Sequence, residues 1–318
     1  MRAAIRVPGL AGDLTAAALV EAEQLGERRF GVSLLSGVAR DEERCDLPCF
    51  DNANRVAELC CAAGLFGPVV VASVAERMVA AARSGGVGIA VLRNLGALGR
   101  LAPYVRWVAT EGLVGVLAVD APPFVAPYGG SAAVLGTNPI AFALPAKPRP
   151  IVVDVSTSSI TMAGLRDAQA AGRDLPLGVA LNSDGLSTAD IDEAVSATPR
   201  GGLMGTLLAL LVESLTGGLS GVLPGPEKRT GTLLVLRPVD AKPLVGTRLV
   251  ESFEKVGARA PGLGPTPEAE RITLEPTTVY ILDRLVPGWR DDEFVEARAA
   301  RPSRNTFPKV SGSRDRPP

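Results

Sequence analysis

Short apolar runs alternate with amphipathic stretches along most of the chain, a pattern typical of a mixed α/β protein. Runs rich in Val, Ile, Leu and Ala predict buried strands at Val87–Leu92, Gly115–Val119, Ile140–Leu144, Ile151–Val155 and Thr232–Leu236. Helical spacing predicts a first helix that Asp13 caps and that runs to about Glu27. Further helices are expected at Ala53–Ala63, Val69–Arg83, Leu101–Glu111, Ile191–Val195, Met204–Leu215 and Thr247–Val256.

A stretch dense in Pro and Gly, Asp120–Pro139, lies between two of the predicted strands. Its prolines fix φ and remove hydrogen-bond donors, while its glycines permit positive φ and close approach of other groups. Asn138 precedes Pro139, which pushes it away from the helical region. Such a loop is expected either as an ordered structural crossover or as a place where a ligand fits against the backbone.

The composition bounds the class of protein. A chain of 318 residues with 47% apolar residues buries a large core in one or two domains. A net charge of −1 and a pI of about 5.8 disfavour electrostatic binding to nucleic acid or to an anionic membrane. The longest apolar candidate for a membrane span, Gly205–Leu223, contains Glu213 and several glycines. No export signal is recognised, so a cytoplasmic protein is expected.

Four cysteines, Cys45, Cys49, Cys60 and Cys61, fall within one short region. Adjacent cysteines on a predicted helix point in different directions, and the chain contains no histidine that could complete a zinc site. Reduced cysteines are therefore favoured over a metal site. From Pro287 the chain is rich in Arg and Pro and poor in apolar residues, which predicts a disordered tail at 287–318.

The loop carries a family resemblance. Pro127-Tyr128-Gly129-Gly130 and Leu135-Gly136-Thr137-Asn138-Pro139 resemble the P-W-G-G and L-G-T-N-P strings of the type-2 malate/L-lactate dehydrogenases, NAD(P)-dependent reductases of 2-oxo acids and cyclic imines. The resemblance runs from about Leu14 to about Leu285 and implies the mixed α/β, non-Rossmann fold of that family. It divides the chain into a mainly helical domain at 1–113, joined by a C-terminal return at about 265–286, and a central sheet domain at 114–264. It also implies a homodimer that binds a small molecule.

A second string, at 154–158, resembles the D-M-A-T-S segment that contacts the dinucleotide in the family. The resemblance therefore assigns cofactor contacts, to NAD or NADP, to Thr137, Asn138, Asp154, Val155, Ser156, Thr157 and Ser158. Their hydroxyl and backbone N–H groups can hold phosphate or ribose as uncharged donors. No residue is assigned to a metal.

The residues that perform chemistry in the family differ here. The S-H-G-V-S-R string reads Arg29-Phe30-Gly31-Val32-Ser33-Leu34, which places Phe30 at a histidine and Leu34 at an arginine. The second histidine position reads Asn94, and two family lysines read Leu165 and Met204. Loss of a general acid typically lowers a rate by about 10²–10⁴, so conventional 2-oxo-acid reduction is disfavoured and no catalytic residue is assigned. Asp120 and Arg93 are the substitute candidates.

Three hypotheses follow. In the first, the chain is a divergent oxidoreductase that still binds NAD(P) or a related small molecule. In the second, it is a non-catalytic homologue, a pseudoenzyme that acts as a binding or assembly partner, and its pocket is filled by Phe30, Leu34, Leu203 and Met204. In the third, it reduces a 2-oxo acid or cyclic imine through substitute residues. The sequence leaves open which of these holds, the substrate, the choice between NAD and NADP, and the role of the cysteines.

Overall fold

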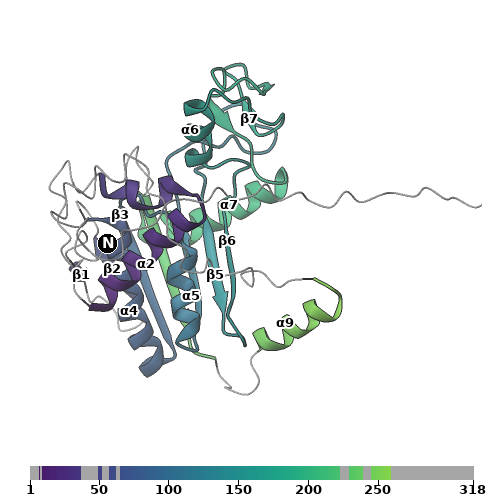
Figure 1. The fold of residues 1–318 in the computed structure, drawn as a ribbon. Coiled ribbons are helices and arrows are strands. Elements are labelled where there is room, and N and C mark those ends of the chain that lie inside the picture. The colour runs from purple at the N-terminus through teal and green to yellow at the C-terminus, as the bar shows by residue number, and fades with distance from the viewer. Residues whose placement is uncertain are drawn as a thin grey trace, which may run out of the picture.

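The computed structural model describes residue 7 and residues 9–36, 49–51, 57–61, 65–222, 229–238 and 245–258. A seven-stranded mixed sheet forms its centre, with the order β1-β2-β3-β10-β4-β5-β6 (Figure 1). The strands are β1 (Cys49–Asp51), β2 (Ala57–Cys61), β3 (Val87–Leu95), β4 (Val114–Val119), β5 (Ile140–Leu144), β6 (Ile151–Val155) and β10 (Arg229–Leu236). Neighbouring strands are antiparallel except β2 and β3. The late strand β10 returns to the centre and pairs with both β3 and β4.

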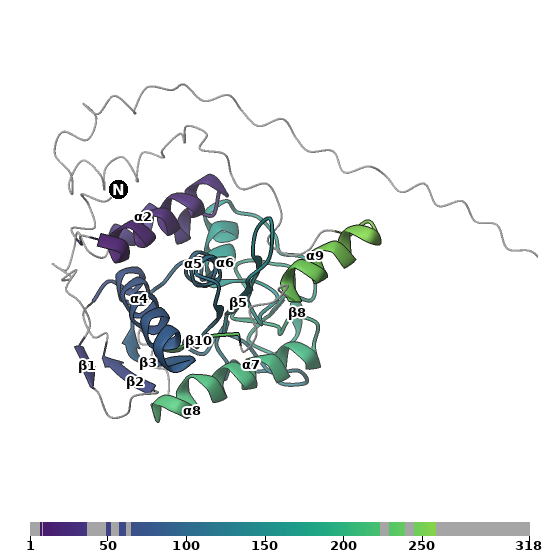
Figure 2. The same ribbon diagram turned by 90° about the horizontal axis from the view of Figure 1, so that it is seen from below.

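Helices cover the two faces of this sheet unequally. On one face lie α2 (Gly9–Gln24), α4 (Gly67–Gly85) and α5 (Ala102–Thr110); on the other lie α7 (Leu203–Leu215) and the short α8 (Gly217–Ser220) (Figure 2). The main core lies under the first group, where the Val/Ala stretch of α4 is almost fully buried. That helix has Pro68 in its first turn and is capped at its C-terminus by Gly86, whose φ of 86° glycine adopts most readily.

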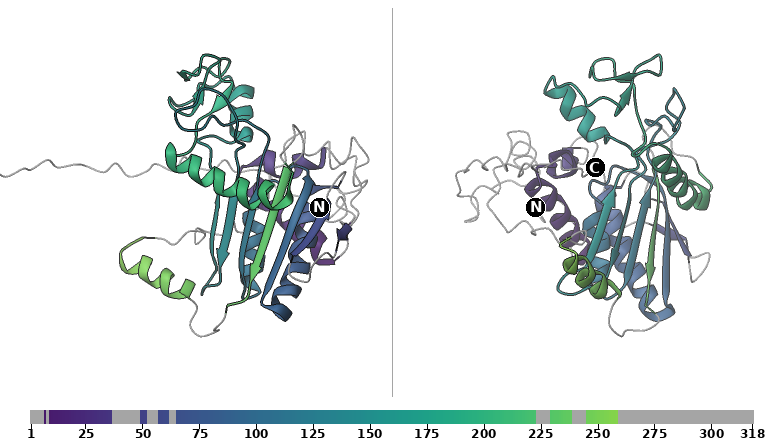
Figure 3. Two further views of the ribbon diagram at one scale, coloured as in Figure 1. Left: turned by 180° about the vertical axis from the view of Figure 1, so that it is seen from behind. Right: turned by 90° about the vertical axis from the view of Figure 1, so that its right-hand side faces the viewer.

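A smaller unit stands at one end of the sheet (Figure 3). It combines α6 (Met162–Ala170) with a three-stranded sheet of order β8-β7-β9, formed by β7 (Ala180–Leu181), β8 (Ser187–Thr188) and β9 (Ser196–Ala197). A separate apolar cluster holds this unit together: Phe124, Val125, Leu135, Leu165, Leu175 and Ile191 are among its buried members. At the other end of the sheet, Val250 of α9 (Val245–Lys255) packs against Ile151.

The strands and most helices predicted from the hydrophobic pattern are confirmed, with ends within a few residues of the expected ones. The helix predicted at Ala53–Ala63 is wrong, because Ala57–Cys61 is a strand that pairs in parallel with β3. Ile191–Val195 is a turn rather than a helix: so short a segment cannot nucleate one, and Ile191 is buried in the smaller core instead. The first helix begins at Gly9, so Asp13 lies inside it and does not cap it.

The domain boundary predicted near residue 113 separates β3 from β4, although both strands pair with β10 in one sheet. The proposed C-terminal return at 265–286, the tail at 287–318 and Cys45 lie outside the described residues. Within the described ranges, Leu203–Ser220 is the one helical stretch long and apolar enough to cross a membrane, a test that a core helix also passes.

One buried polar group in the core gives a test of the packing. Tyr104 of α5 is fully buried, and its hydroxyl has no hydrogen-bond partner among the described residues. We expect Tyr104→Phe to raise the free energy of unfolding by about 1 kcal/mol, because an unsatisfied buried hydroxyl costs about 1–3 kcal/mol. The matched control is Thr232→Val, which removes a hydroxyl that donates to the Leu215 carbonyl at 2.6 Å and should lower stability by about 1 kcal/mol. Urea unfolding measures both; destabilisation by Tyr104→Phe would contradict the packing described.

Candidate active site

The candidate site lies where β3 and β4 end and β10 begins, at the end of the sheet that faces α6 (Figure 1). The antiparallel register sets Arg229 opposite Leu95 and Gly231 opposite Val119. Residues that follow β3 and β4 therefore lie beside the first residues of β10, although they are more than 100 positions away in the chain.

A β-bulge shapes this edge. Between the Gly231–Leu92 and Arg229–Leu95 pairs, β3 uses one more residue than β10. Asn94 lies in this bulge with φ of 55°, in the left-handed region that asparagine tolerates better than most residues. The bulge therefore sets the backbone geometry at Asn94. This is the position at which the family resemblance places a histidine, and here the side chain is an amide.

The segment that carries the other histidine position packs against the turn after β3. A Cβ atom at Gly99 would lie 2.7 Å from the carbonyl oxygen of Phe30 and 3.1 Å from Cδ1 of Leu34. The structure therefore brings together the two segments, 29–34 and 94–99, in which the resemblance places the histidines. Phe30 and Leu34 are both half-buried, and Leu34 packs against the main core.

Arg29 links this segment to the smaller unit. Its guanidinium pairs with the carboxylate of Asp167, and its Nη2 donates to the carbonyl oxygen of Arg166 at 3.3 Å; both partners are on α6. Residues 28–34 and α6 thus flank the same end of the sheet.

Asp120 is fully buried directly after β4. Its Oδ1 accepts from the backbone N–H of Thr230 at 2.6 Å, and its Oδ2 accepts from the hydroxyls of Thr230 and Thr216. The carboxylate therefore ties β4 to β10 and to the junction of α7 and α8. Burial raises the pKa of Asp120, and the hydrogen bonds from Thr230 and Thr216 and the charge of Arg229 offset part of that effect.

Asn138 is also fully buried, with φ of 36°, and extends the same group of contacts. Its Oδ1 accepts from the Ala121 N–H at 3.1 Å, and its Nδ2 donates to Glu213 Oε1 at 2.9 Å and to the Ala209 carbonyl at 3.3 Å. Burial raises the pKa of Glu213, the hydrogen bond from Asn138 lowers it, and the negative charge of Asp120 adds to the increase. Both amide ends of Asn138 are therefore occupied within the protein. The cofactor contact that the resemblance assigns to Asn138 remains a prediction.

The other assigned cofactor residues form a compact loop. The Thr137 carbonyl accepts from Ser156 Oγ at 2.9 Å and from the N–H and hydroxyl of Thr157, each at 3.1 Å. The Ser158 hydroxyl lies 2.6 Å from that of Ser156 and donates to the Ile160 carbonyl at 2.7 Å. The structure therefore brings residues 137 and 156–158 together, while Val155 is 41% exposed at the end of β6.

Asp154 lies apart from this loop in its contacts. Its Oδ2 accepts from the backbone N–H groups of Leu101 at 2.9 Å and Ala102 at 2.8 Å, at the start of α5. These are donors that a helix N-terminus leaves without partners of its own, so Asp154 caps α5 from a neighbouring strand. Burial raises the pKa of Asp154, and these two hydrogen bonds oppose the increase.

Arg93, one of the two substitute candidates, also makes a helix-end contact. Its Nε donates to the Ser220 carbonyl at 2.9 Å, and its Nη2 donates to the same oxygen. That carbonyl is at the C-terminus of α8, where a cation interacts favourably with the helix dipole. This contact gives Arg93 a structural role.

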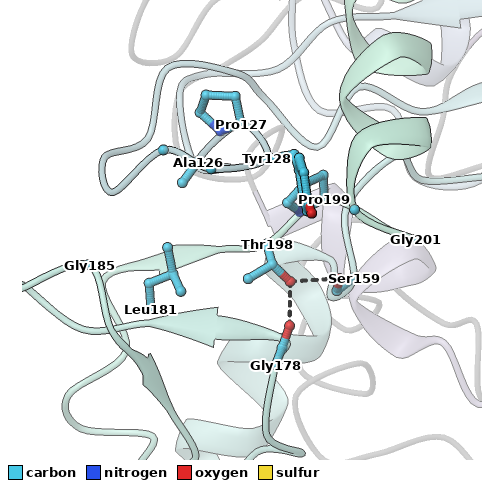
Figure 4. Close-up of a pocket in the computed structure, with 13 residues that line it drawn as sticks. Ala126, Pro127, Tyr128, Ser159, Gly178, Leu181, Gly185, Thr198, Pro199 and Gly201 are labelled. Atoms are coloured by element: carbon cyan, nitrogen blue, oxygen red, sulfur yellow. Dashed lines mark hydrogen bonds between the residues drawn. The ribbon is translucent and has the colours of Figure 1, made fainter.

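A pocket of about 360 Å³ opens between the Pro127–Gly130 segment, the smaller sheet and the start of α7 (Figure 4). Its polar lining includes the hydroxyls of Ser159 and Thr198, which lie 2.8 Å apart, and Thr198 donates to the Gly178 carbonyl at 2.6 Å. The lining residues are uncharged: Ala126, Pro127, Tyr128, Gly129, Gly130, Ser159, Gly178, Leu181, Gly185, Thr198, Pro199, Gly201 and Gly202. The pocket thus joins two segments that the sequence marked separately, the P-Y-G-G string and the glycines before α7.

Leu203 and Met204 do not line this pocket, and they are 55% and 61% exposed at the start of α7. The expectation that they fill the pocket together with Phe30 and Leu34 is therefore wrong for these two. They lie on the exposed side of α7, whose buried residues are Gly205, Ala209 and Val212.

Several residues of the site were not found from the sequence. Glu213 had a signal, as an acidic residue in an otherwise apolar run. Thr216, Thr230 and Arg229 had none, because their importance comes from pairing between distant strands and helices.

Comparison with known proteins places the chain among dehydrogenases. The sequence profile of malate/L-lactate dehydrogenase matches residues 3–232, and the chain belongs to this family. This confirms the family and fold expected from the sequence. The chain is 36% identical over 231 residues to (2R)-3-sulfolactate dehydrogenase (NADP(+)) of Chromohalobacter salexigens, covering 69% of this chain and 68% of that relative. It is 38% identical over 164 residues to a Delta(1)-pyrroline-2-carboxylate/Delta(1)-piperideine-2-carboxylate reductase of Pseudomonas putida, covering 50% of this chain and 48% of that relative.

Among solved structures, delta1-piperideine-2-carboxylate reductase from Pseudomonas syringae pv. tomato superposes with a TM-score of 0.75 at 27% identity, covering 89% of this chain and 95% of that one. The curated matches span about half to two thirds of the relatives' lengths, whereas the structural match spans nearly the whole chain.

The buried carboxylate of Asp120 predicts a pH dependence of stability. The pKa of Asp120 in the folded protein is raised above the unfolded value of about 3.9. The stabilising contribution of its protonated form to the free energy of unfolding is therefore fully present below that unfolded pKa and is lost as pH rises through the folded pKa. Asp120→Asn keeps the uncharged form at every pH. Its stability relative to the wild type should therefore increase from about pH 4 upward and level off above the folded pKa, with each pKa unit worth about 1.4 kcal/mol.

Urea unfolding between pH 4.5 and 8 measures this difference. The control is Asp174→Asn, at an exposed position, which should leave the pH profile of the wild type unchanged. A constant difference between Asp120→Asn and the wild type across this range would show that the carboxyl does not titrate as described.

Proposed function

We propose that this protein is an NAD(P)-binding oxidoreductase that reduces a cyclic imine carboxylate in preference to a 2-oxo acid. The observation that carries the proposal is a contrast within one site. The segments that hold the backbone of the cofactor region are tied together by hydrogen bonds at Thr137 and residues 156–158, whereas both histidine positions hold side chains that cannot donate a proton, Phe30 and Asn94.

The pocket of Figure 4 has a lining that fits an uncharged part of a dinucleotide. Gly129, Gly178 and Gly201 have positive φ, and a Cβ atom at each would meet nothing within 4 Å, so their backbone is accessible from the pocket. The hydroxyls of Ser159 and Thr198 add neutral donors and acceptors. These are the groups that would hold a ribose or a phosphate without a salt bridge, and a relative named above carries NADP(+) in its name.

When bound, a reduced nicotinamide supplies a hydride, which converts a carbonyl into an alkoxide and a protonated imine into a neutral amine. An alkoxide needs a positioned acid, and the segments 29–34 and 92–96 provide none at the family positions. A substrate that already carries its proton needs no such residue. The amide of Asn94 and the apolar surfaces of Phe30 and Leu34 can therefore orient an imine ring and exclude water without moving a proton.

The test is a comparison of substrates. With NADPH or NADH, turnover of piperideine-2-carboxylate should exceed that of pyruvate or sulfopyruvate by at least about 10²-fold, the lower range of a general-acid effect. The rate should fall as pH rises and the imine loses its proton. Leu181→Trp, which narrows the pocket, should raise the KM for the nucleotide at least tenfold, and the exposed Leu25→Trp should not.

The combined variant Phe30→His, Leu34→Arg, Asn94→His and Met204→Lys should gain 2-oxo-acid reduction if the scaffold is intact. Equal turnover of keto acid and imine by the wild type would contradict the proposal. Absence of a thermal shift with either nucleotide would favour instead a non-catalytic binding or assembly partner.

We also propose that the protein forms a homodimer through α7. The exposed apolar residues of this helix are Leu203, Met204, Leu207, Leu208, Leu210 and Leu211, each between 40% and 61% exposed. A helix that is apolar on nearly all sides is normally covered. A second copy suits this face, because a two-fold contact brings each patch against itself and residues 203–212 contain no charge that would repel its own copy.

The oligomeric state tests this proposal. The wild type should run as a dimer in light scattering after gel filtration, and Leu207→Glu combined with Leu211→Glu should run as a monomer, because a two-fold contact would bury these charges against each other. Leu186→Glu is the control: this leucine is 64% exposed but lies outside α7. A wild type that stays monomeric at high concentration would refute the dimer.

A further inference from the structure

Arg229 is the first residue of β10 and faces the side of the sheet on which the two histidine segments meet. The hydroxyls of Thr230 and Thr232 bind Asp120 and the Leu215 carbonyl on the α7–α8 side. Leu233 and Val235 belong to the main core on the opposite side. Because side chains alternate along a strand, Arg229 projects on the side of Leu233, where α2, α4 and α5 lie.

Asn94 lies next to Leu95, the partner of Arg229 in the strand register. The segment of Phe30 packs on the turn after β3, and its Leu34 packs against the main core, on the side to which Arg229 projects. A cation is thus placed beside the position where the family resemblance would have put a catalytic histidine.

The positive charge of Arg229 is not neutralised by a direct ion pair within the described part of the chain, although the charge of Asp120 acts on it. The guanidinium is half-buried, yet it pairs with no carboxylate and makes no side-chain hydrogen bond among those residues. The nearby carboxylate, Asp120, already accepts three hydrogen bonds from Thr230 and Thr216. A partly desolvated guanidinium is costly unless an anion completes its five donors.

A second cation adds to this imbalance. Burial lowers the pKa of Arg229 and the charge of Asp120 opposes that effect, but the positive charge of Arg166 on α6 lowers it further. Arg166 is exposed, and its backbone carbonyl holds Arg29 against α6. The charge of a second guanidinium, on a different unit of the protein, therefore reaches Arg229.

We propose that Arg229, assisted by Arg166, binds the carboxylate of the substrate and replaces the family arginine that reads Leu34 here. A guanidinium binds a carboxylate through two parallel N–H···O bonds, which fixes the plane of a ring attached to it. This inference deepens the proposed function and rests on it for the identity of the substrate, but the anion site itself can be measured without nucleotide or turnover.

The probe is 2-furoate, a planar ring carboxylate with no reducible C=N bond, and 2-furamide is its uncharged counterpart. Titration calorimetry on the full chain should show 2-furoate binding that 2-furamide does not reproduce. Arg229→Gln should weaken 2-furoate binding at least tenfold, and Arg229→Lys should weaken it less, because the charge stays while the paired donors are lost. The matched control is Arg237→Gln at the opposite end of the same strand, where Nη1 donates to the Arg83 carbonyl; it should bind as the wild type does.

The proposal is overturned if Arg229→Gln binds 2-furoate like the wild type while retaining its thermal unfolding profile, or if 2-furamide binds as well as 2-furoate. If Arg229→Gln fails to fold, Arg166→Gln, at an exposed position, provides the test. It should bind 2-furoate about three- to tenfold more weakly than the wild type, and unchanged binding would contradict the proposed site. If inorganic phosphate competes as strongly as 2-furoate, the site is a general anion site and the ring carboxylate is refuted.

The two proposals fail in different ways. Loss of 2-furoate binding in Arg229→Gln together with no nucleotide binding by the wild type would leave the anion site standing and remove the reductase. Imine reduction whose KM is unchanged in Arg229→Gln would leave the reductase standing and remove this role of Arg229.

Discussion

The carboxylate of Asp120 is the contact on which the arrangement of the site depends. It sits where β4 ends, and it is bound by groups on β10 and at the α7–α8 junction. Leaving such a carboxylate buried without donors would cost several kcal/mol, so the three elements must stay in register for the charge to be tolerated. Asn138 joins the same group through Glu213 and holds the loop before β5 against α7. The loop at 137 and 156–158, to which the resemblance assigns cofactor contacts, therefore begins directly beside a buried hydrogen-bonded residue, Asn138.

Side chains that differ from the family strings also contribute to the packing of this framework. Phe30 and Leu34 are half-buried against the turn at Gly99, where apolar contact stabilises the segment. The side chains of Asp154 and Arg93 form hydrogen bonds with the ends of α5 and α8, and these contacts hold the helices against the sheet. Polar groups that hold elements together are present, and the two positions at which the family resemblance places a histidine read Phe30 and Asn94.

The fold was predictable to the extent that local pattern decides structure. The Val/Ala run of α4 has helical spacing, and β4, β5 and β6 are short apolar runs with Gly or Pro beside them. The helix predicted at Ala53–Ala63 is wrong because a run as short as Ala57–Cys61 fits a helical or a strand period. Its pairing with β3 makes it a strand. The helix α6 was missed, since Met162–Ala170 buries only Leu165 and Ala168 and so has little apolar stripe.

The site was predictable only in part, for a related reason. The resemblance assigns cofactor contacts to Thr137, Asn138 and residues 154–158, and these stay predictions. It gives no sign that Asn138 donates to Glu213 or that Asp154 caps α5. Glu213 carried a sequence signal as an acid in an apolar run, whereas Arg229 looked like any charge between two loops. Its significance comes from what surrounds it: a bulge on β3, a saturated carboxylate and a second arginine on α6.

The balance of charge at this end of the sheet links these observations. The family pattern places a cation at position 34, on the segment that packs over the turn after β3, and this chain has a leucine there. A leucine in contact with Gly99 closes that segment onto the core. Arg229, the proposed replacement, lies on β10, where pairing with β3 holds its backbone. A guanidinium held in this way suits the proposed recognition of a planar anion, and its position depends on the same Thr230 that binds Asp120.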